Sequence, residues 1–232
     1  MTSHRRRSFL AGVGSASALA LAGCMGGMDD DEPAQTAAGG VGETLDTHPA
    51  AVDADQWPVL GPEIGEAGGT LIVFDDVSCP RCAAYHDGAL STIRSDHVET
   101  GEVSLVARPY PVVYDWGGPA AHALEATYDR DPDAFWELQA HYFDEQGEFN
   151  ADNVLDRTES WLEANTSLDA EGVVDDAENG QFDDRIGSTL DAGEETDAGG
   201  VTPVTFVFDG DELATTLTGS VSYVTIQTVL GL

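Results

Sequence analysis

Apolar residues follow a spacing that predicts a mixed α/β domain beginning near Trp57. Short β-branched runs typical of strands occur at 70–74, 103–107, 204–208 and 213–217. Helical spacing occurs at 83–94, 120–128, 133–143, 153–164, 169–179, 182–190 and 220–230. The predicted order is therefore β-α-β, then a helical block over about 119–193, then β-β-α. No internal repeat is visible.

The residues before this domain carry a different pattern. Residues 24–56 are rich in Gly, Ala, Asp and Thr, with almost no large apolar side chain, which predicts a flexible acidic tether. Residues 1–23 have a basic start and then an uncharged apolar stretch too short for a comfortable membrane span, as in a signal peptide.

Two short motifs refine the prediction for this signal. Arg6-Arg7-Ser8-Phe9-Leu10 resembles the twin-arginine export motif, and Leu21-Ala22-Gly23-Cys24 resembles a lipobox in which Cys24 becomes the lipidated N-terminus. The alternatives are an uncleaved N-terminal anchor, or a plain signal with an incidental cysteine. We expect twin-arginine export and a lipid anchor on the extracytoplasmic face of the cell membrane, where disulfides persist.

The net charge of the chain limits the classes of molecule that it could bind. The chain has 43 Asp and Glu against 9 Lys and Arg, all of them Arg, and a net charge of −34. This excludes nucleic-acid binding by phosphate neutralisation and argues against docking on anionic lipids through basic residues. The acids are spread evenly from Asp29 to Glu212, and molar salt would screen their repulsion, so we predict a halophilic protein. An acidic mesophilic protein is the alternative.

The candidate chemistry lies in Cys79-Pro80-Arg81-Cys82, at the predicted start of a helix. Unpaired first-turn amides and the positive end of the helix dipole favour a thiolate at Cys79, and Arg81 adds to this effect. Asp75 and Asp76 act in the opposite direction, and Pro80 suits a first helical turn. Cys82 lies one turn inside the helix, so we expect it to be buried and to resolve mixed disulfides formed at an exposed Cys79.

Two other interpretations of this Cys-x-x-Cys pair are a zinc half-site and an inert structural disulfide. Zinc takes four ligands, and His86 is the only nearby candidate besides the two thiols. A disulfide across two residues closes almost no loop and contributes little stability. We therefore expect no metal and no organic cofactor, because the Cys79–Cys82 disulfide is itself the redox group.

A second candidate element is Thr202-Pro203, directly before the apolar run at 204–208. Proline is compatible with the first residue of a strand. Cis X-Pro bonds are a minority of all X-Pro bonds, so the residues alone favour a trans bond.

These motifs together resemble the DsbA-like thioredoxin-fold disulfide oxidoreductases, over about residues 57–232. The likeness rests on Phe74-x-Asp76-x-x-Cys79-Pro80-x-Cys82 followed by His86, on Gly200-Val201-Thr202-Pro203-x-x-Phe206-Val207-x-Asp209-Gly210, on Leu217-x-Gly219, and on Phe135-Trp136-Glu137-Leu138 to Gln146. The resemblance implies an α/β, thioredoxin-like fold with an inserted helical domain between the second strand and the proline loop. It also implies a cis peptide bond at Thr202-Pro203. The loop that carries this bond would lie against the two cysteines and pair with an extended substrate segment.

We therefore expect an exported, membrane-tethered thiol–disulfide oxidoreductase. Its partners are exported client proteins with thiols or disulfides, and a redox partner, not yet identified, that regenerates the dithiol. Net oxidation of client thiols is the expected direction in an oxidising exterior. The rival interpretations are a reductase or isomerase serving haem-attachment or copper-site cysteines, and a non-catalytic binding module of the same fold.

Overall fold

The centre of the molecule is one six-stranded mixed sheet. The computed structural model describes residues 35–38, 42–196 and 198–232. The strand order is β1-β6-β5-β3-β4-β2, and β3 and β4 are the parallel pair while the other neighbours are antiparallel. The strands are β1 (Gln35–Ala38), β2 (Val59–Leu60), β3 (Gly69–Asp75), β4 (Val103–Pro109), β5 (Val204–Asp209) and β6 (Glu212–Thr218).

Strand β3 is buried at all seven positions because both faces of the sheet are covered. Its alternating side chains enter two separate cores. Leu71 and Val73 pack toward the helices that follow β3 and toward the C-terminal helix, whereas Ile72 and Phe74 pack on the opposite face. The continuous apolar run at 70–74 therefore marks a central strand, as its pattern predicts.

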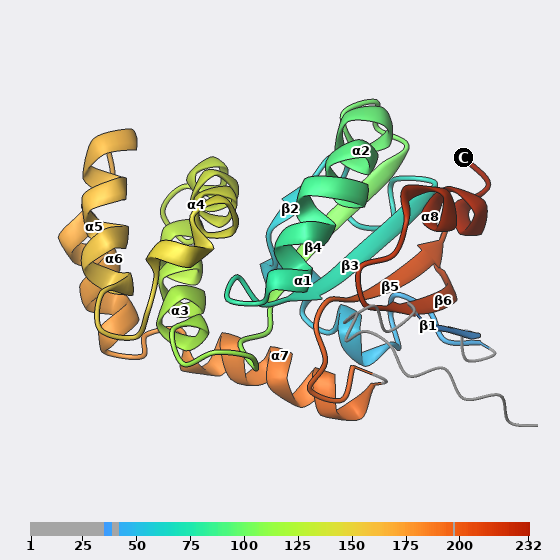
Figure 1. Ribbon diagram of the computed structural model, residues 1–232. Coiled ribbons are helices and arrows are strands. Elements are labelled where there is room, and N and C mark those ends of the chain that lie inside the picture. The colour runs from blue at the N-terminus through green and yellow to red at the C-terminus, as the bar shows by residue number, and fades with distance from the viewer. Residues whose placement is uncertain (1–34, 39–41, 197) are drawn as a thin grey trace, which may run out of the picture. The chain divides into compact units, whose positions relative to one another are not determined.

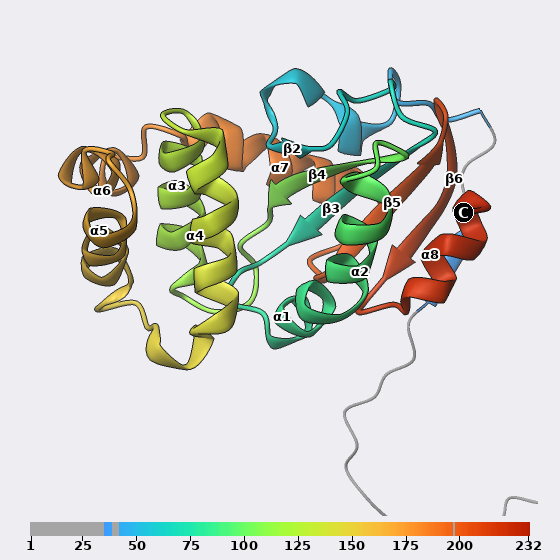
Figure 2. The same cartoon turned by 90° about the horizontal axis from the view of Figure 1, so that it is seen from above.

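The first of these faces is covered by a long helical run and by the last helix. The run consists of α1 (Pro80–Tyr85), a π-helical segment (His86–Leu90), α2 (Ser91–Ile93) and a second π-helical segment (Arg94–Val98). It extends four residues beyond the predicted end at 94. Helix α8 (Tyr223–Leu230) begins later than predicted, because the Ser222 side chain accepts a hydrogen bond from Thr225 N and caps it. Figures 1 and 2 show α2 and α8 on one side of the sheet and α7 on the other.

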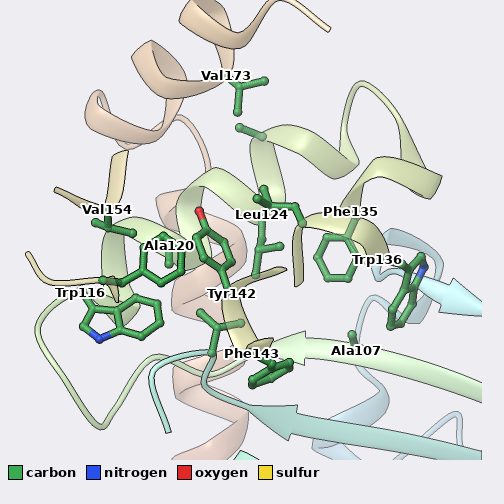
Figure 3. Close-up of a cluster of buried hydrophobic side chains, with 14 of the residues drawn as sticks. Ala107, Trp116, Ala120, Leu124, Phe135, Trp136, Tyr142, Phe143, Val154 and Val173 are labelled. Atoms are coloured by element: carbon green, nitrogen blue, oxygen red, sulfur yellow. The ribbon is translucent and has the colours of Figure 1, made fainter. Parts of the chain in front are cut away.

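The block between β4 and β5 is helical, as predicted. It comprises α3 (Gly117–Tyr128), α4 (Pro132–Asp144), α5 (Val154–Asn165), α6 (Ala170–Glu178) and α7 (Asp183–Glu195). Its core is aromatic and includes Trp116, Phe135, Tyr142 and Phe143 (Figure 3). The same cluster continues to Cys79 and Cys82, so the insertion packs directly against the candidate site.

The segment before Trp57 differs from the predicted flexible tether. Residues 42–56 lie on the domain and form two short 3-10 helices, Pro49–Ala51 and Ala54–Gln56. The buried guanidinium of Arg108 donates to Pro49 O at 3.2 Å and Ala50 O at 2.7 Å, and its centre lies 4.1 Å from the Trp57 ring centroid. The small side chains of this segment let its backbone approach the sheet closely. Because the buried Arg108 of β4 binds carbonyl groups of the segment, few large apolar residues are needed to hold it on the domain. For residues 42–56 the tether prediction is wrong.

The predicted signal, twin-arginine motif, lipobox and Cys24 lie outside the described residues. Within the part of the chain that the structure describes, no helix combines the length and hydrophobicity that a membrane crossing requires.

Candidate active site

The two cysteines lie where β3 passes into the helical run. Strand β3 ends at Asp75, and Cys79 is the extended residue that precedes α1, with φ −81° and ψ 119°. Pro80 occupies the first helical turn, where a missing N–H costs nothing. Cys79 O accepts hydrogen bonds from Cys82 N at 3.0 Å and Ala83 N at 3.2 Å, which places both thiols at the helix start. Both cysteines are free thiols.

The carboxylate of Asp76 holds the loop that carries Cys79. Its Oδ1 accepts from Ser78 N at 2.8 Å, and its Oδ2 accepts from Val112 N and Val113 N, both at 2.8 Å. A Cβ on Gly117 would lie 2.6 Å from Asp76 Oδ1, so glycine is required where α3 begins. Asp76 therefore joins two loops through backbone amides, a contact that its predicted tuning role did not include.

The proline loop lies against the nucleophile candidate. The Thr202-Pro203 peptide bond is cis, as the family resemblance implies. Cys79 Sγ donates to Thr202 O at 3.7 Å, although the two residues are far apart in sequence. Gly200 N donates to the Tyr110 hydroxyl at 3.1 Å, which fixes the loop to the end of β4. The structure thus brings together Cys79, Cys82, Thr202 and Pro203.

The expectation of an exposed Cys79 is wrong for this structure. Cys79 is only 3% exposed, and Cys82 is fully buried. The cause is the surrounding structure: the Thr202 backbone lies at the Cys79 sulfur, and Cys79 belongs to the apolar cluster that includes Val77 and Trp116. A sulfur atom that reacts with Cys79 must therefore reach it past the Thr202 backbone and the surrounding apolar side chains.

The two thiols have opposite acid–base character. A hydrogen bond from the Cys82 thiol is the largest influence on Cys79 and lowers its pKa from 9.0 to about 6, against the opposing effect of burial. Contact with Thr202 and the backbone N–H groups of Cys82 and Arg81 lower it further. The Cys79 pKa is therefore lowered, as predicted, but the hydrogen bond from the Cys82 thiol lowers it more than the amides at the helix start do. Arg81 contributes through its backbone, and its side chain is exposed.

Burial raises the pKa of Cys82 well above its ordinary value. The hydrogen bond to Cys79 and the negative charge of Asp75 raise it further. One sulfur of the pair is therefore prepared to act as a thiolate near neutral pH, while the other holds its proton.

Gln146, from the short 3-10 helix Gln146–Glu148, connects the insertion to the cysteine loop. Its Nε2 donates to Val77 O at 2.6 Å and to Cys79 O at 3.0 Å. The sequence places Gln146 within the family likeness but gives no signal that it reaches a residue so far upstream.

The end of β3 carries an acid–histidine contact that was not predicted, between the buried Asp75 and the half-buried His86. Asp75 is 1% exposed, and its Oδ2 lies 2.6 Å from His86 Nε2. The His86 ring stacks on Phe143 of α4, with 4.2 Å between ring centroids. Among the described residues, no group of three or more His, Cys, Asp or Glu side chains is arranged to hold a metal ion.

Comparison with known proteins gives a consistent set of relatives. Residues 58–226 match the family model described as Thioredoxin. Disulfide bond formation protein D of Bacillus subtilis is 31% identical over 91 residues, which cover 38% of this chain and 39% of that protein. This chain thus spans about two fifths of the length of that relative.

Two solved structures share the fold at low sequence identity. Oxidised BdbD from Bacillus subtilis has a TM-score of 0.63 and 22% identity, covering 77% of this chain and 95% of that one. DsbA from Chlamydia trachomatis has a TM-score of 0.62 and 22% identity, covering 75% and 90%.

Proposed function

Because the chain belongs to the thioredoxin family, we propose that it is an extracytoplasmic thiol–disulfide oxidoreductase that forms or exchanges disulfides in exported proteins. Its predicted fold, thioredoxin-like with an inserted helical domain, is confirmed by the family match and by the similar structures. In this proposal Cys79 is the nucleophile, Cys82 resolves the mixed disulfide, and Thr202 and Pro203 position the client.

The observation that carries the proposal is the division of acidity between two adjacent thiols. Cys79 has a pKa of about 6, and Cys82 has a pKa raised by burial. The thiolate is the reactive form in disulfide exchange, so Cys79 reacts first near neutral pH. Cys82 is held within hydrogen-bonding reach of the sulfur that it must attack.

The same acidity supports the oxidising direction. At pH 7 a thiol with a pKa of about 6 is roughly ten parts thiolate to one part thiol, which stabilises the dithiol form by about 1.4 kcal/mol relative to an ordinary cysteine. For a two-electron couple this raises the potential by about 30 mV. The thiolate thus contributes to the oxidising power of the disulfide without setting it alone.

The surface around the dithiol supports a protein client. Of the described residues, five large apolar side chains are exposed: Val52, Val113, Tyr114, Val201 and Val224. Val113 and Tyr114 lie on the loop held by Asp76 and Ser78, and Val201 directly precedes Thr202. We call Val113, Tyr114 and Val201 the client face. Its apolar side chains suit an unfolded segment in which a cysteine has apolar neighbours.

Equilibration of the purified chain with glutathione buffers, in molar salt, tests the function. Oxidised and reduced forms are separated by thiol alkylation. A potential of about −120 mV supports an oxidant, and one of about −270 mV indicates a reductase. Cys82→Ser should trap clients as mixed disulfides on Cys79, whereas the matched Cys79→Ser variant should trap none. Absence of any exchange at either cysteine would contradict the proposal and favour a binding module.

We further propose that the chain is exported by the twin-arginine route and anchored through a lipid on Cys24. The support is the order of the two sequence motifs and the extracytoplasmic setting that a stable disulfide needs. Cys24→Ala should move the protein from the membrane fraction to the medium. An unchanged membrane fraction would contradict the lipid anchor and leave the redox proposal intact.

A further inference from the structure

The turn between α5 and α6 carries a short sequence that the redox chemistry does not use. Asn165-Thr166-Ser167 has the form Asn-x-Ser, which is an acceptor sequence for the attachment of sugar to an asparagine side chain in exported proteins. The chain has four asparagines, and at the other three the residue two places later is neither Ser nor Thr. Asn165 is therefore the single asparagine of the chain in an acceptor sequence.

The fold presents this sequence at the surface. Asn165 and Ser167 are both exposed, and Thr166 between them is half-buried. Helix α5 ends at Asn165, and Thr166 is extended, with φ −127° and ψ 176°. The acceptor sequence therefore leaves the helix at its first residue and continues into an exposed turn, which is the surface setting that this modification requires.

The contacts within the turn leave the acceptor group within reach of solvent. The Thr166 hydroxyl donates to Leu162 O at 2.8 Å and accepts from Leu168 N at 3.2 Å, so the middle residue of the sequence holds the turn. Asn165 Nδ2 donates to Trp161 O at 2.8 Å, and this contact is exposed. Water can replace it when the Asn165 side chain swings outward, so the acceptor nitrogen is not bound into the core.

This turn lies away from the cysteine loop. Helix α5 begins beside the segment that carries Gln146, which bonds Cys79 O, and its 12 residues rise by about 18 Å toward Asn165. Figures 1 and 2 show α3 and α4 between the sheet and the pair α5 and α6. A bulky group at Asn165 would therefore stand clear of Cys79 and of the client face.

We propose that Asn165 is glycosylated once the chain is outside the cytoplasm. The inference rests on the proposed function in one respect, the extracytoplasmic location, because this acceptor sequence is used in exported chains. An acceptor on a folded chain must be reachable at the surface, and Asn165 and Ser167 both meet that requirement. The attached sugar is bulky and solubilising, so it enlarges the exposed end of the insertion without changing the dithiol.

The transfer exchanges one bond of the sugar for another. The donor is an activated sugar whose C1 carbon is bonded to an oxygen of a phosphate group. Asn165 Nδ2 attacks C1, the N–C1 bond forms, and the C1–O bond breaks as the phosphate leaves with its electron pair. One proton leaves Nδ2, and nothing is oxidised or reduced. The hydroxyl of Ser167 is the second group that the transferring enzyme reads.

Asn165 also has a purely structural contact, because its Nδ2 closes the last turn of α5 on Trp161 O. Changes at Ser167 separate this contact from glycosylation. Ser167→Ala keeps Asn165 and its bond but removes the hydroxyl of the acceptor sequence, whereas Ser167→Thr keeps a hydroxyl at the same position. Only glycosylation depends on which of these two residues follows.

The test uses the full chain, with its signal, produced in cells that glycosylate their own exported proteins and recovered from their membrane fraction. Trypsin releases residues 158–185 as one peptide, because Arg157 and Arg185 bound it and the chain has no Lys. The same peptide contains Asn179, which is exposed but lies outside any acceptor sequence. Fragmentation in the mass spectrometer assigns any added sugar to Asn165 or to Asn179.

We expect the parent chain and Ser167→Thr to carry sugar on Asn165. In Asn165→Gln and Ser167→Ala the modified fraction of this peptide should fall to zero. Asn179 should be unmodified in all four chains and serves as the internal control. The potential of the dithiol against glutathione should be the same in all four, because the turn lies away from Cys79.

An unmodified 158–185 peptide in the exported parent chain would overturn the proposal, as would sugar on Asn165 of Ser167→Ala. A parent chain found only inside the cells would overturn the proposed location and the glycosylation together. An exported chain with sugar on Asn165 but no thiol exchange at Cys79 or Cys82 would overturn the redox function alone. The failures are therefore distinguishable.

Discussion

At the scale of single residues, the acidity of Cys79 depends first on a side chain and only then on the helix. The Cys82 thiol donates the hydrogen bond that lowers the Cys79 pKa most, ahead of Thr202 and the backbone N–H groups. The reactive form of one sulfur is thus stabilised by the protonated form of the other. This explains why a buried, weakly acidic Cys82 is compatible with a reactive Cys79.

Replacement of Cys82 should therefore change the acidity of Cys79 in a residue-specific way. In Cys82→Ser the hydroxyl still donates, and we expect the Cys79 thiolate to form with a midpoint near 6. In Cys82→Ala the largest stabilising contact is lost, so the midpoint should rise toward 9.0. Thiolate absorbance at 240 nm against pH measures both. Equal midpoints in the two variants would show that the backbone amides are sufficient.

The client face gives a second prediction at this scale. Tyr114→Ser should slow the oxidation of a reduced, unfolded protein severalfold and leave the oxidation of dithiothreitol unchanged, because a small dithiol needs no apolar surface. The Tyr114 amide bonds Ser78, so the loop keeps its backbone contact. Val224→Ser, a change at a similarly exposed apolar position on α8, is the matched control. Equal loss with both substrates would assign Tyr114 to the dithiol rather than to the client.

At the scale of elements, the short 3-10 helix at Gln146 fastens the insertion to the cysteine loop. Gln146→Ala removes donors from the carbonyl groups of Val77 and Cys79, and we expect a loss of about 1–3 kcal/mol in the free energy of unfolding. Thermal unfolding in molar salt measures this loss. Gln56→Ala, at an exposed position, should change stability by less than about 0.5 kcal/mol. Equal effects of the two changes would contradict the anchoring role.

The pattern of apolar residues predicts those helices and strands in which the pattern is continuous along the chain. The strands β3 to β6 and the helices of the insertion follow from apolar periodicity, which packing on a shared core preserves. The strands β1 and β2, of four and two residues, carry no such signal, because pairing with β6 and β4 defines them. Their positions depend on the fold rather than on their own residues.

The residues of the candidate site likewise fall into those that the sequence predicts and those that it does not. Cys79 and Cys82 are predictable because two thiols at one helix start have a local chemical meaning. Asp75 and Gln146 are not, because their roles arise from contacts with His86 and with Cys79 O that only the folded chain creates. The enclosure of Cys79 is likewise a property of the loop at Thr202, which packs on it from a distant part of the chain.

At the scale of the whole molecule, the distribution of charge requires screening. The net charge is −34, and the described arginines form ion pairs with Asp176, Glu148 and Glu125 that involve only three of the many acids. Unpaired carboxylates repel one another over about 10 Å at 0.1 M salt but over only about 3 Å at 1 M. Stability should therefore rise steeply with salt concentration.

Dilution from 2 M to 0.1 M potassium chloride should abolish the near-ultraviolet circular dichroism of the buried aromatic side chains. Returning the salt should restore it. Sucrose at 1 M favours compact states without screening charge, so it should restore the signal only weakly. Full recovery in sucrose would show that repulsion between carboxylates is not the cause.

The two outermost strands of the sheet bear on the proposed function, in which the protein would meet unfolded chains. An unoccupied sheet border attracts any extended polypeptide, whatever its sequence, through main-chain pairing. Here β1 covers β6, and β2 covers part of β4. The border is therefore formed by strands of only four and two residues, which leaves little continuous backbone on which a passing chain could pair.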